Sequence, residues 1–218
     1  YEAPIFQKGE APYLDTKTGA FYKNPDGSFA YTMAPLRFSL TVPKRYWEQG
    51  AALLDALPIV MYSHGTGGDY KTPVNNGVAT HLAKLGIACF SIDQPIHGTR
   101  VGSTFAGQGW LFFNPLNFLA ARDNIRQSVL DFVWIRHMLA SIKIKVNDLD
   151  FGFKREKIWF MGHSQGAMTG GPLIGIEKDL KAAILSAPSA ALIHSFLPAP
   201  NRPADHPNNV TPYIDYLI

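Results

Sequence analysis

A short apolar run at 158–161 leads into a serine that lies between two glycines, and no other feature constrains the fold as much. The segment 158–166 reads Ile-Trp-Phe-Met-Gly-His-Ser-Gln-Gly, which places Ser164 in the pattern G-x-S-x-G. This pattern is typical of a turn where a strand ends, the serine adopts a strained backbone conformation and a helix begins at once. The apolar segment from Ala167 onward favours that helix. We therefore predict a nucleophile elbow that exposes the Ser164 hydroxyl.

Gly162 and Gly166 have a mechanical role in this prediction. Side chains at these positions would collide where the strand and the helix cross, and the turn needs backbone freedom that glycine supplies at least cost. Both positions are therefore expected to be sites of close backbone approach.

A second apolar run, at 58–63, leads into the glycine-rich loop His64-Gly65-Thr66-Gly67-Gly68. The run has the length and composition of a buried strand. Together with the serine motif, this loop resembles the α/β-hydrolase superfamily, and the resemblance covers residues 58–186. The similar branches are the platelet-activating-factor acetylhydrolases, the dienelactone hydrolases and the cutinase-like lipases.

The resemblance implies a site and a reaction. In that superfamily the glycine loop supplies one backbone N–H to an oxyanion hole, and the residue after the nucleophile supplies the other. Matched by position, these donors would be the N–H groups of Thr66 and Gln165. The implied activity is hydrolysis of small-molecule or lipid carboxylic esters through an acyl-enzyme on Ser164, with no cofactor and no metal.

Other interpretations of these loops remain. Residues 65–72 nearly match the phosphate-binding pattern G-x-x-x-x-G-K-[ST], but Tyr70 stands where a glycine must let the backbone wrap a phosphate. The loop could also be a turn without chemistry. Asp93 and His97, four positions apart on a loop, could attract a metal, although two ligands do not make a site. A hydrogen-bonded carboxylate and a packed histidine are the alternative for that pair.

Composition excludes several classes of protein. The chain has 218 residues, of which 46% are hydrophobic and 17% are charged, and its formal net charge is +3. These values are typical of one domain with a sizeable core, and they predict no surface for nucleic acid. The single cysteine, Cys89, lies in the apolar run 87–92, which predicts a buried thiol.

Two further expectations concern the compartment. No apolar stretch reaches the roughly 20 residues needed to cross a bilayer, so we expect no transmembrane segment. The chain starts at Tyr1 and not at methionine. We therefore expect a processed N-terminus and an exported protein, either periplasmic or extracellular.

The N-terminal quarter predicts irregular structure followed by antiparallel strands. Residues 1–19 carry prolines, glycines and charges without periodicity, which predicts an extended arm on the surface. Within 20–57, an Asn-Pro-Asp-Gly turn favours a hairpin over 20–32, and the alternation over 36–42 is typical of a half-buried strand. The rest of this segment, 44–57, predicts a short helix-like insertion.

Residues 58–186 predict the core of a single α/β domain spanning 1–218. Strand and helix patterns alternate here with short crossovers, which is typical of a doubly wound, mostly parallel sheet. The expected strands are 58–63, 87–92, 158–161 and 181–186, and the expected crossover helices are 74–85 and 121–141.

Three segments of this core depart from the simple alternation. Residues 99–120 are rich in aromatic side chains, and they could line or cover an acyl-binding cleft or pack as ordinary core. Residues 143–157 predict a polar loop. Pro172 follows Ser164 so closely that we expect a short or kinked helix after the serine.

The last segment, 187–218, is rich in proline and predicts a cap. The superfamily order is serine, then an acid, then a histidine, each after a further strand, and the segment contains no such strands. The candidates in it are Asp205, Asp215, His194 and His206, and none follows a strand pattern. We therefore expect the acid and the base on sequence after Ile218 or on a second fragment that completes the fold.

Two other functions stay open on the same motifs. The protein could be an acyltransferase that passes the acyl group to an alcohol instead of water. It could also be a binding module that retains the fold without catalysis.

Overall fold

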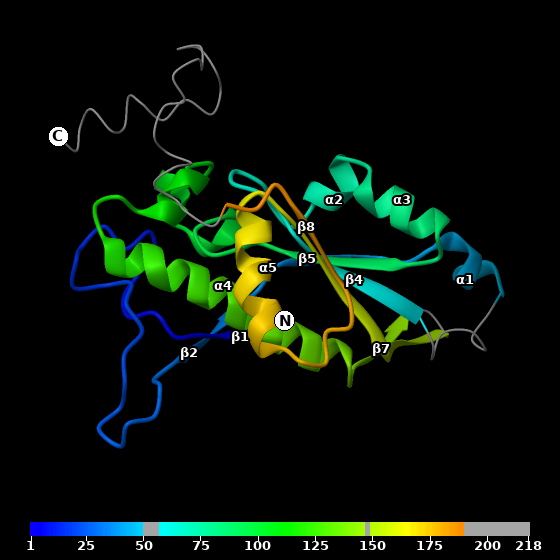
Figure 1. Ribbon diagram of the computed structural model, residues 1–218, viewed down its shortest axis with the longest axis horizontal. Helices are drawn as coiled ribbons and strands as arrows, with labels where there is room; N and C mark the ends of the chain where they lie inside the picture. Colours follow the sequence, from blue (N-terminus) through cyan, green and yellow to red (C-terminus); the bar gives the residue numbers. More distant parts are fainter. Residues whose placement is uncertain (50–56, 147–148, 190–218) are drawn as a thin grey trace, which may run out of the picture. The chain divides into compact units, whose positions relative to one another are not determined.

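The computed structural model describes residues 1–49, 57–146 and 149–189. The fold presented here is that of the compact unit Tyr1–Pro188. Its main sheet has six strands. The strands are β3 (Phe38–Thr41), β4 (Leu57–Ser63), β5 (Ala88–Ile92), β6 (Lys143–Val146), β7 (Leu149–His163) and β8 (Ala183–Ser186). Strand β7 pairs with three of the others, β4 and β8 along its second part and β6 along its first (Figure 1).

Four of these strands run parallel, in the order β5, β4, β7 and β8. Strand β3 pairs antiparallel with β5 at one edge, and β6 forms an antiparallel hairpin with the first part of β7. This is the mostly parallel sheet with an antiparallel N-terminal strand that the sequence predicts. The expected fold class, a doubly wound α/β sheet, is therefore confirmed.

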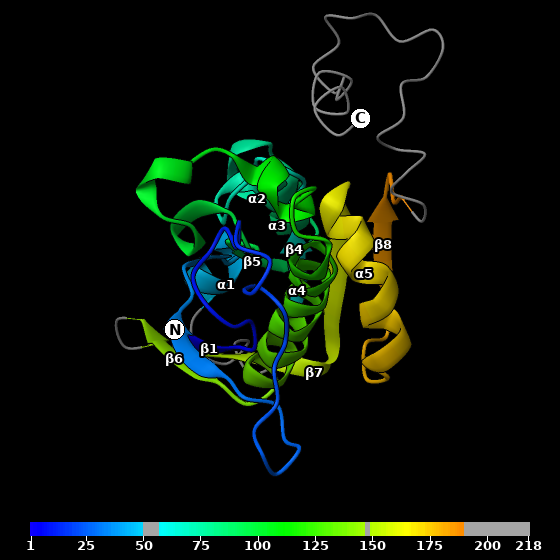
Figure 2. The same cartoon turned by 90° about the vertical axis from the view of Figure 1, so that its left-hand side faces the viewer.

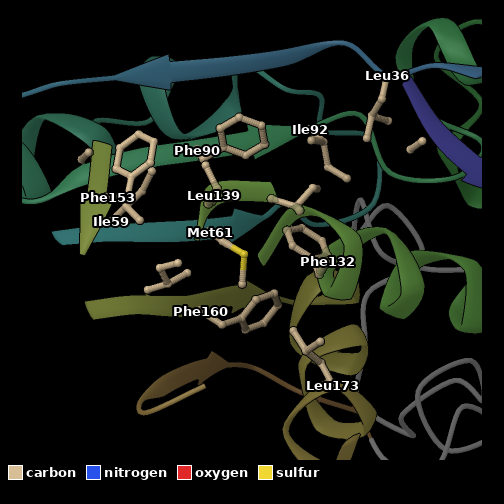
Figure 3. Close-up of a cluster of buried hydrophobic side chains, with 14 of the residues drawn as sticks. Leu36, Ile59, Met61, Phe90, Ile92, Phe132, Leu139, Phe153, Phe160 and Leu173 are labelled. Carbon is tan, nitrogen blue, oxygen red and sulfur yellow. The ribbon is translucent and has the colours of Figure 1, made fainter. Parts of the chain in front are cut away.

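Helices cover both faces of the sheet. Alternate strand residues point to opposite faces, and apolar side chains on each face pack against the helices. On one face, Met61 and Phe160 pack under α4 (Phe118–Leu139) and α5 (Gln165–Ile176). Figure 3 shows Phe132 of α4 and Leu173 of α5 directed at these two side chains, and the rings of Phe132 and Phe160 meet edge to face at 5.1 Å. This face holds the main core of the unit.

The other face of the sheet packs against shorter helices. Tyr62 and Cys89 pack there with Ala79 of α3 (Val78–Lys84). Each follows or precedes a residue of the main core along its strand, so its side chain points to the opposite face. A single turn, α2 (Thr72–Asn75), precedes α3, so the expected helix 74–85 is divided in two. Cys89 is buried, as its surroundings in the sequence predict.

The N-terminal segment is not the surface arm that its composition predicts. Strand β1 (Glu2–Ile5) pairs antiparallel with β2 (Thr32–Pro35) in a separate two-stranded sheet, and Ala3 is fully buried. The side-chain amide of Gln127 on α4 accepts the Phe6 N–H at 2.8 Å. The segment is ordered because polar groups of α4 satisfy its backbone, a long-range effect that local composition does not reveal.

A hairpin connects β1 to β2 at the expected position. Tyr22 O accepts the Ala30 N–H at 3.0 Å, and the turn is closed between Asn24 and Gly27. Figure 2 shows this turn, in blue, extending away from α4. Helix α1 (Lys44–Gln49) forms the start of the expected insertion, and the remainder of that prediction, 50–56, lies outside the described residues.

One prediction about the second half of the core is wrong. The segment 143–157 is not a polar loop, because β6 and the first residues of β7 pair as a hairpin, with Ile144 opposite Phe151. Here tertiary packing outweighs a local signal. Helix α5 contains Pro172 and continues to Ile176, so of the two expected forms, a short or a kinked helix, the short one is not found.

The segment 99–120 contains three short 3₁₀ turns, η2 (Gly98–Arg100), η3 (Ser103–Phe105) and η4 (Gly109–Phe113), followed by the start of α4. Of the cap expected at 187–218, all but the first three residues lie outside the described residues. No helix in the described part of the chain is both long and apolar enough to span a membrane.

Candidate active site

Ser164 lies at the turn between β7 and α5, with φ 53° and ψ −118°. A positive φ is strained for a serine, and such strain persists only where the surroundings impose it. Two backbone bonds do so, because the Ser164 N–H donates to Ser186 O at 2.9 Å and Ser164 O accepts the Ala167 N–H at 2.9 Å. The Ser164 hydroxyl is partly exposed and has no hydrogen-bond partner among the described residues.

The two glycines around the serine are sites of close backbone approach. A Cβ on Gly162 would lie 2.3 Å from Gly166 O, and a Cβ on Gly166 would lie 2.1 Å from Ser63 O on β4. No side chain can approach a backbone oxygen so closely. The first residues of α5 therefore lie so close to β7 and β4 that only glycine fits at these two positions.

The glycine loop lies directly over the serine. A Cβ on Gly65 would be 3.2 Å from the Ser164 Cβ, which places the loop after β4 in contact with the turn after β7. Thr66 and Gln165 are joined across this contact, because the Thr66 hydroxyl donates to the side-chain oxygen of Gln165 at 2.9 Å. The structure thus brings together the three residues that the sequence singles out.

The backbone N–H groups of Thr66 and Gln165 donate no hydrogen bond to any described residue. For Gln165 this follows from its position as the first residue of α5, since the first N–H groups of a helix have no intrahelical acceptor. Two unpaired N–H donors beside a free serine hydroxyl can stabilise negative charge that develops on a substrate oxygen.

A buried polar network supports the base of the turn. Gln94, at the end of β5, donates through its side-chain amide to His64 O, and its carbonyl oxygen accepts the Ser128 hydroxyl at 3.0 Å. The hydroxyls of Ser128 on α4 and Thr169 on α5 are 3.0 Å apart. The sequence gives no sign of this network, because its members are polar residues scattered over 105 positions, from His64 to Thr169.

His64 and His97 are both buried and both neutral in this arrangement. Burial lowers the pKa of His64, and burial together with the neighbouring His64 lowers the pKa of His97 to about 4. Each ring makes one bond as a donor and one as an acceptor: His64 Nδ1–H donates to Gly65 O at 2.8 Å, and Nε2 accepts the Gln94 N–H at 3.2 Å. His64 is therefore occupied in the loop and is unsuited to act as a base.

The other described histidines are also engaged away from the Ser164 hydroxyl. His163 Nδ1 pairs with the Ser186 hydroxyl at 3.2 Å, and His81 Nδ1 lies 2.8 Å from Gly77 O. His137 Nε2 lies 3.3 Å from Glu177. The later candidates from the sequence, His194, His206, Asp205 and Asp215, lie outside the described residues.

Asp93 is a structural carboxylate. It is fully buried and accepts hydrogen bonds from the Arg37 guanidinium at 2.8 Å and the Tyr70 N–H at 3.0 Å. A Cβ on Gly98 would lie 2.2 Å from this carboxylate, so the chain wraps it closely. Among the described residues, no group of three or more His, Cys, Asp or Glu side chains is placed to hold a metal ion.

The aromatic stretch divides into core and surface. Leu111 and Phe112 are buried with Tyr13 in a second hydrophobic cluster, which is the core packing considered for this segment. Trp110 is 36% exposed and Phe118 is 76% exposed. Gly109, the residue before Trp110, approaches the glycine loop closely, since a Cβ on it would lie 2.8 Å from the Gly67 nitrogen.

A cavity of about 930 Å³ lies elsewhere, between the N-terminal segment and the loop 95–102. Tyr13, Arg37 and Arg100 are among its lining residues, whereas Ser164, Thr66 and Gln165 do not line it. The cavity is therefore separate from the candidate site.

No protein-family model matches the chain, and no curated protein matches it. Among solved structures it is similar to Est1E from Butyrivibrio proteoclasticus with bound ferulic acid, at 20% identity and a TM-score of 0.46, over 70% of this chain and 49% of that one. A putative dienelactone hydrolase from Klebsiella pneumoniae gives 16% identity and a TM-score of 0.46, over 63% and 50% of the two chains.

The alpha/beta hydrolase GrgF from a Penicillium species gives 15% identity and a TM-score of 0.43, over 86% of this chain and 46% of that one. The chain spans about half the length of these solved structures.

Proposed function

We propose that the protein hydrolyses carboxylic esters through an acyl-enzyme on Ser164, which occupies a nucleophile elbow. The observation that carries this proposal is the combination of a strained, unbonded serine hydroxyl with two unpaired backbone N–H groups from Thr66 and Gln165. Strain of this kind is retained where it presents a side chain for chemistry. The glycine contacts with Ser63 and Gly166 hold the three groups together.

The proposed reaction proceeds in two steps. The Ser164 oxygen attacks the ester carbonyl carbon, a base takes the hydroxyl proton, and the carbonyl π electrons move onto oxygen. The resulting oxyanion accepts hydrogen bonds from the two N–H groups, each of which is worth about 3 kcal/mol in comparable sites. Collapse of this intermediate breaks the bond to the alcohol oxygen, which takes up the proton. Water then repeats the sequence on the acyl-enzyme and releases the acid.

The base is assigned to a histidine outside the described residues. The five described histidines are engaged elsewhere, two of them as buried neutral rings within the glycine loop and its support. His194 and His206 are the candidates in the printed sequence. A base is required because a serine hydroxyl is a weak nucleophile at neutral pH.

The test compares the complete natural polypeptide with its Ser164→Ala variant. The assays are p-nitrophenyl acetate hydrolysis and labelling by a fluorophosphonate, with the labelled peptide identified by mass. We expect the variant to lose both, because removal of the nucleophile in such enzymes lowers turnover by about a million-fold. The matched control is Ser141→Ala, at the exposed end of α4, which should behave as the wild type.

Two outcomes would contradict the proposal. If Ser164→Ala kept more than a few per cent of the hydrolysis, another residue would be the nucleophile. If the wild type neither hydrolysed the ester nor reacted with the fluorophosphonate, the chain would be a binding module. Product analysis with added alcohol separates hydrolysis from acyl transfer, since transfer yields a new ester.

A further inference from the structure

The turn that follows β5 holds the glycine loop and the residues just after it. Gln94 binds His64, the first residue of the loop, through both its backbone N–H and its side chain. His97 Nε2 accepts the Gly67 N–H at 3.0 Å. Two residues beyond the loop, the Tyr70 N–H donates to Asp93 Oδ1 at 3.0 Å. One short turn therefore fixes the glycine loop at two points and the chain that leaves it at a third.

The bond to Gly67 requires one tautomer of His97. The Nδ1 of this ring lies 2.9 Å from Pro95 O, which can only accept, so Nδ1 carries the proton and Nε2 carries a free lone pair. His97 is 3% exposed, and its low pKa keeps the ring neutral near pH 7. It therefore acts as an acceptor toward the loop and is not available as a proton carrier.

The imidazole has little room to move. A Cβ on Gly109 would lie 2.3 Å from His97 Nε2, so the backbone of η4 closes one side of the ring. The His64 ring packs edge to face against it with centroids 4.9 Å apart, and the Phe112 ring lies at 6.2 Å. The acceptor is thus fixed by packing as well as by its own hydrogen bond.

The Gly67 N–H belongs to the peptide that begins at Thr66, the residue whose own N–H is a proposed oxyanion donor. When this peptide is held, the backbone on one side of Thr66 is held too. Gly67 has φ 80°, and a glycine adopts positive and negative φ about equally readily, so its own conformational preference does not fix the peptide. We propose that His97 is a positioning residue, which holds the Thr66 peptide in the orientation needed to stabilise the transition state. This inference rests on the proposed function of Ser164.

The test uses two substitutions in the complete natural polypeptide. His97→Gln can present a side-chain carbonyl oxygen to the Gly67 N–H, whereas His97→Leu fills a similar volume without an acceptor. We expect the leucine variant to lower kcat about 10- to 100-fold with KM changed less than about twofold, because a misplaced donor costs transition-state binding. The glutamine variant should recover about tenfold of this loss. His81→Leu, on the exposed helix α3, is the control and should leave kcat unchanged.

Active sites are counted by fluorophosphonate titration, so that kcat refers to folded enzyme. A leucine variant with kcat within twofold of the wild type would overturn the inference. So would a loss confined to KM, or a glutamine variant as slow as the leucine one. If Ser164→Ala is inactive and His97→Leu is normal, only the inference fails; if Ser164→Ala is active, the proposed function itself fails.

A second measurement on the wild type covers the case in which His97→Leu does not fold. An N–H···N hydrogen bond transmits a spin coupling between its two nitrogens, so ¹⁵N-labelled protein should show a coupling between the Gly67 amide and His97 Nε2 at neutral pH. Its presence supports the inference, and its absence overturns it.

Discussion

The hydroxyl of Thr66 donates a 2.9 Å hydrogen bond to the side-chain oxygen of Gln165, which joins two residues 99 positions apart. Thr66 belongs to the loop after β4, and Gln165 is the first residue of α5. Gln165 is buried, with 1% of its surface exposed, whereas Thr66 is exposed. The bond therefore joins the side chains of the two residues whose backbone N–H groups are unpaired, and it holds the two segments together.

Removing this bond should slow the chemical step without unfolding the protein. Thr66→Val keeps the shape of the side chain and loses the hydroxyl, and we expect kcat to fall about 3- to 10-fold, in line with the roughly 1 kcal/mol of one hydrogen bond. Thr66→Ser keeps the hydroxyl and should stay within about twofold of the wild type. Steady-state kinetics on p-nitrophenyl acetate measure both, and equal loss in the two variants would show that the hydroxyl is irrelevant.

A methyl group at Gly166 should destabilise the protein, whereas one at Gly171 in the same helix should not. A Cβ on Gly166 would lie 2.1 Å from Ser63 O, so α5 must shift, at a cost of about 1–3 kcal/mol or more. Nothing lies within 4 Å of a Cβ on Gly171, where alanine should stabilise the helix by about 0.5–1 kcal/mol. Denaturant unfolding of both variants is the measurement. Similar effects at the two positions would contradict the packing described for the turn.

Sequence periodicity predicts much of the core because strands such as β4 and β5 are short and buried on both faces. The runs that become β4, β5 and β8 are apolar, and the helix that becomes α4 repeats its apolar positions at spacings of three and four. The N-terminal segment could not be predicted in this way. Its order comes from single long-range bonds such as Phe6 to Gln127, 121 positions apart, and these leave no local pattern.

The candidate site shows the same division. Ser164, Thr66 and Gln165 were predicted because the two glycine motifs constrain local backbone geometry, and local geometry is encoded in short stretches. The role of His97 could not be predicted, since the ring acts on Gly67, which lies 30 positions earlier. The sequence leaves two interpretations of Asp93 open, a metal ligand and a hydrogen-bonded carboxylate, and the structure has the second.

Trp110 should favour esters with long acyl chains. The residue before it, Gly109, approaches the glycine loop closely, and Trp110 is 36% exposed. We therefore expect an acyl chain that leaves the site on this side to contact its ring. Trp110→Ala should lower kcat/KM for a p-nitrophenyl octanoate about 10- to 100-fold, which corresponds to 1–3 kcal/mol of lost apolar contact, and should affect the acetate far less. Leu85→Ala, 70% exposed at the end of α3, is the control. Equal losses on both esters would assign Trp110 to packing.

Acidification should destabilise the protein through His97. Burial and the neighbouring His64 and Arg100 lower its pKa to about 4, against the hydrogen bond to Pro95 O and the charge of Asp93, while the unfolded chain has a histidine pKa near 6.5. Between these values the unfolded state binds more protons, so the free energy of unfolding rises with pH and falls on acidification. For His97 alone the loss from pH 7.5 to 4.5 is about 2.5 kcal/mol. His64, whose pKa is also lowered, adds to the loss in the wild type and in His97→Gln alike. Urea unfolding at both pH values should therefore show a drop about 2.5 kcal/mol smaller in His97→Gln than in the wild type, and parallel drops would show that the ring binds protons equally in the folded and the unfolded states.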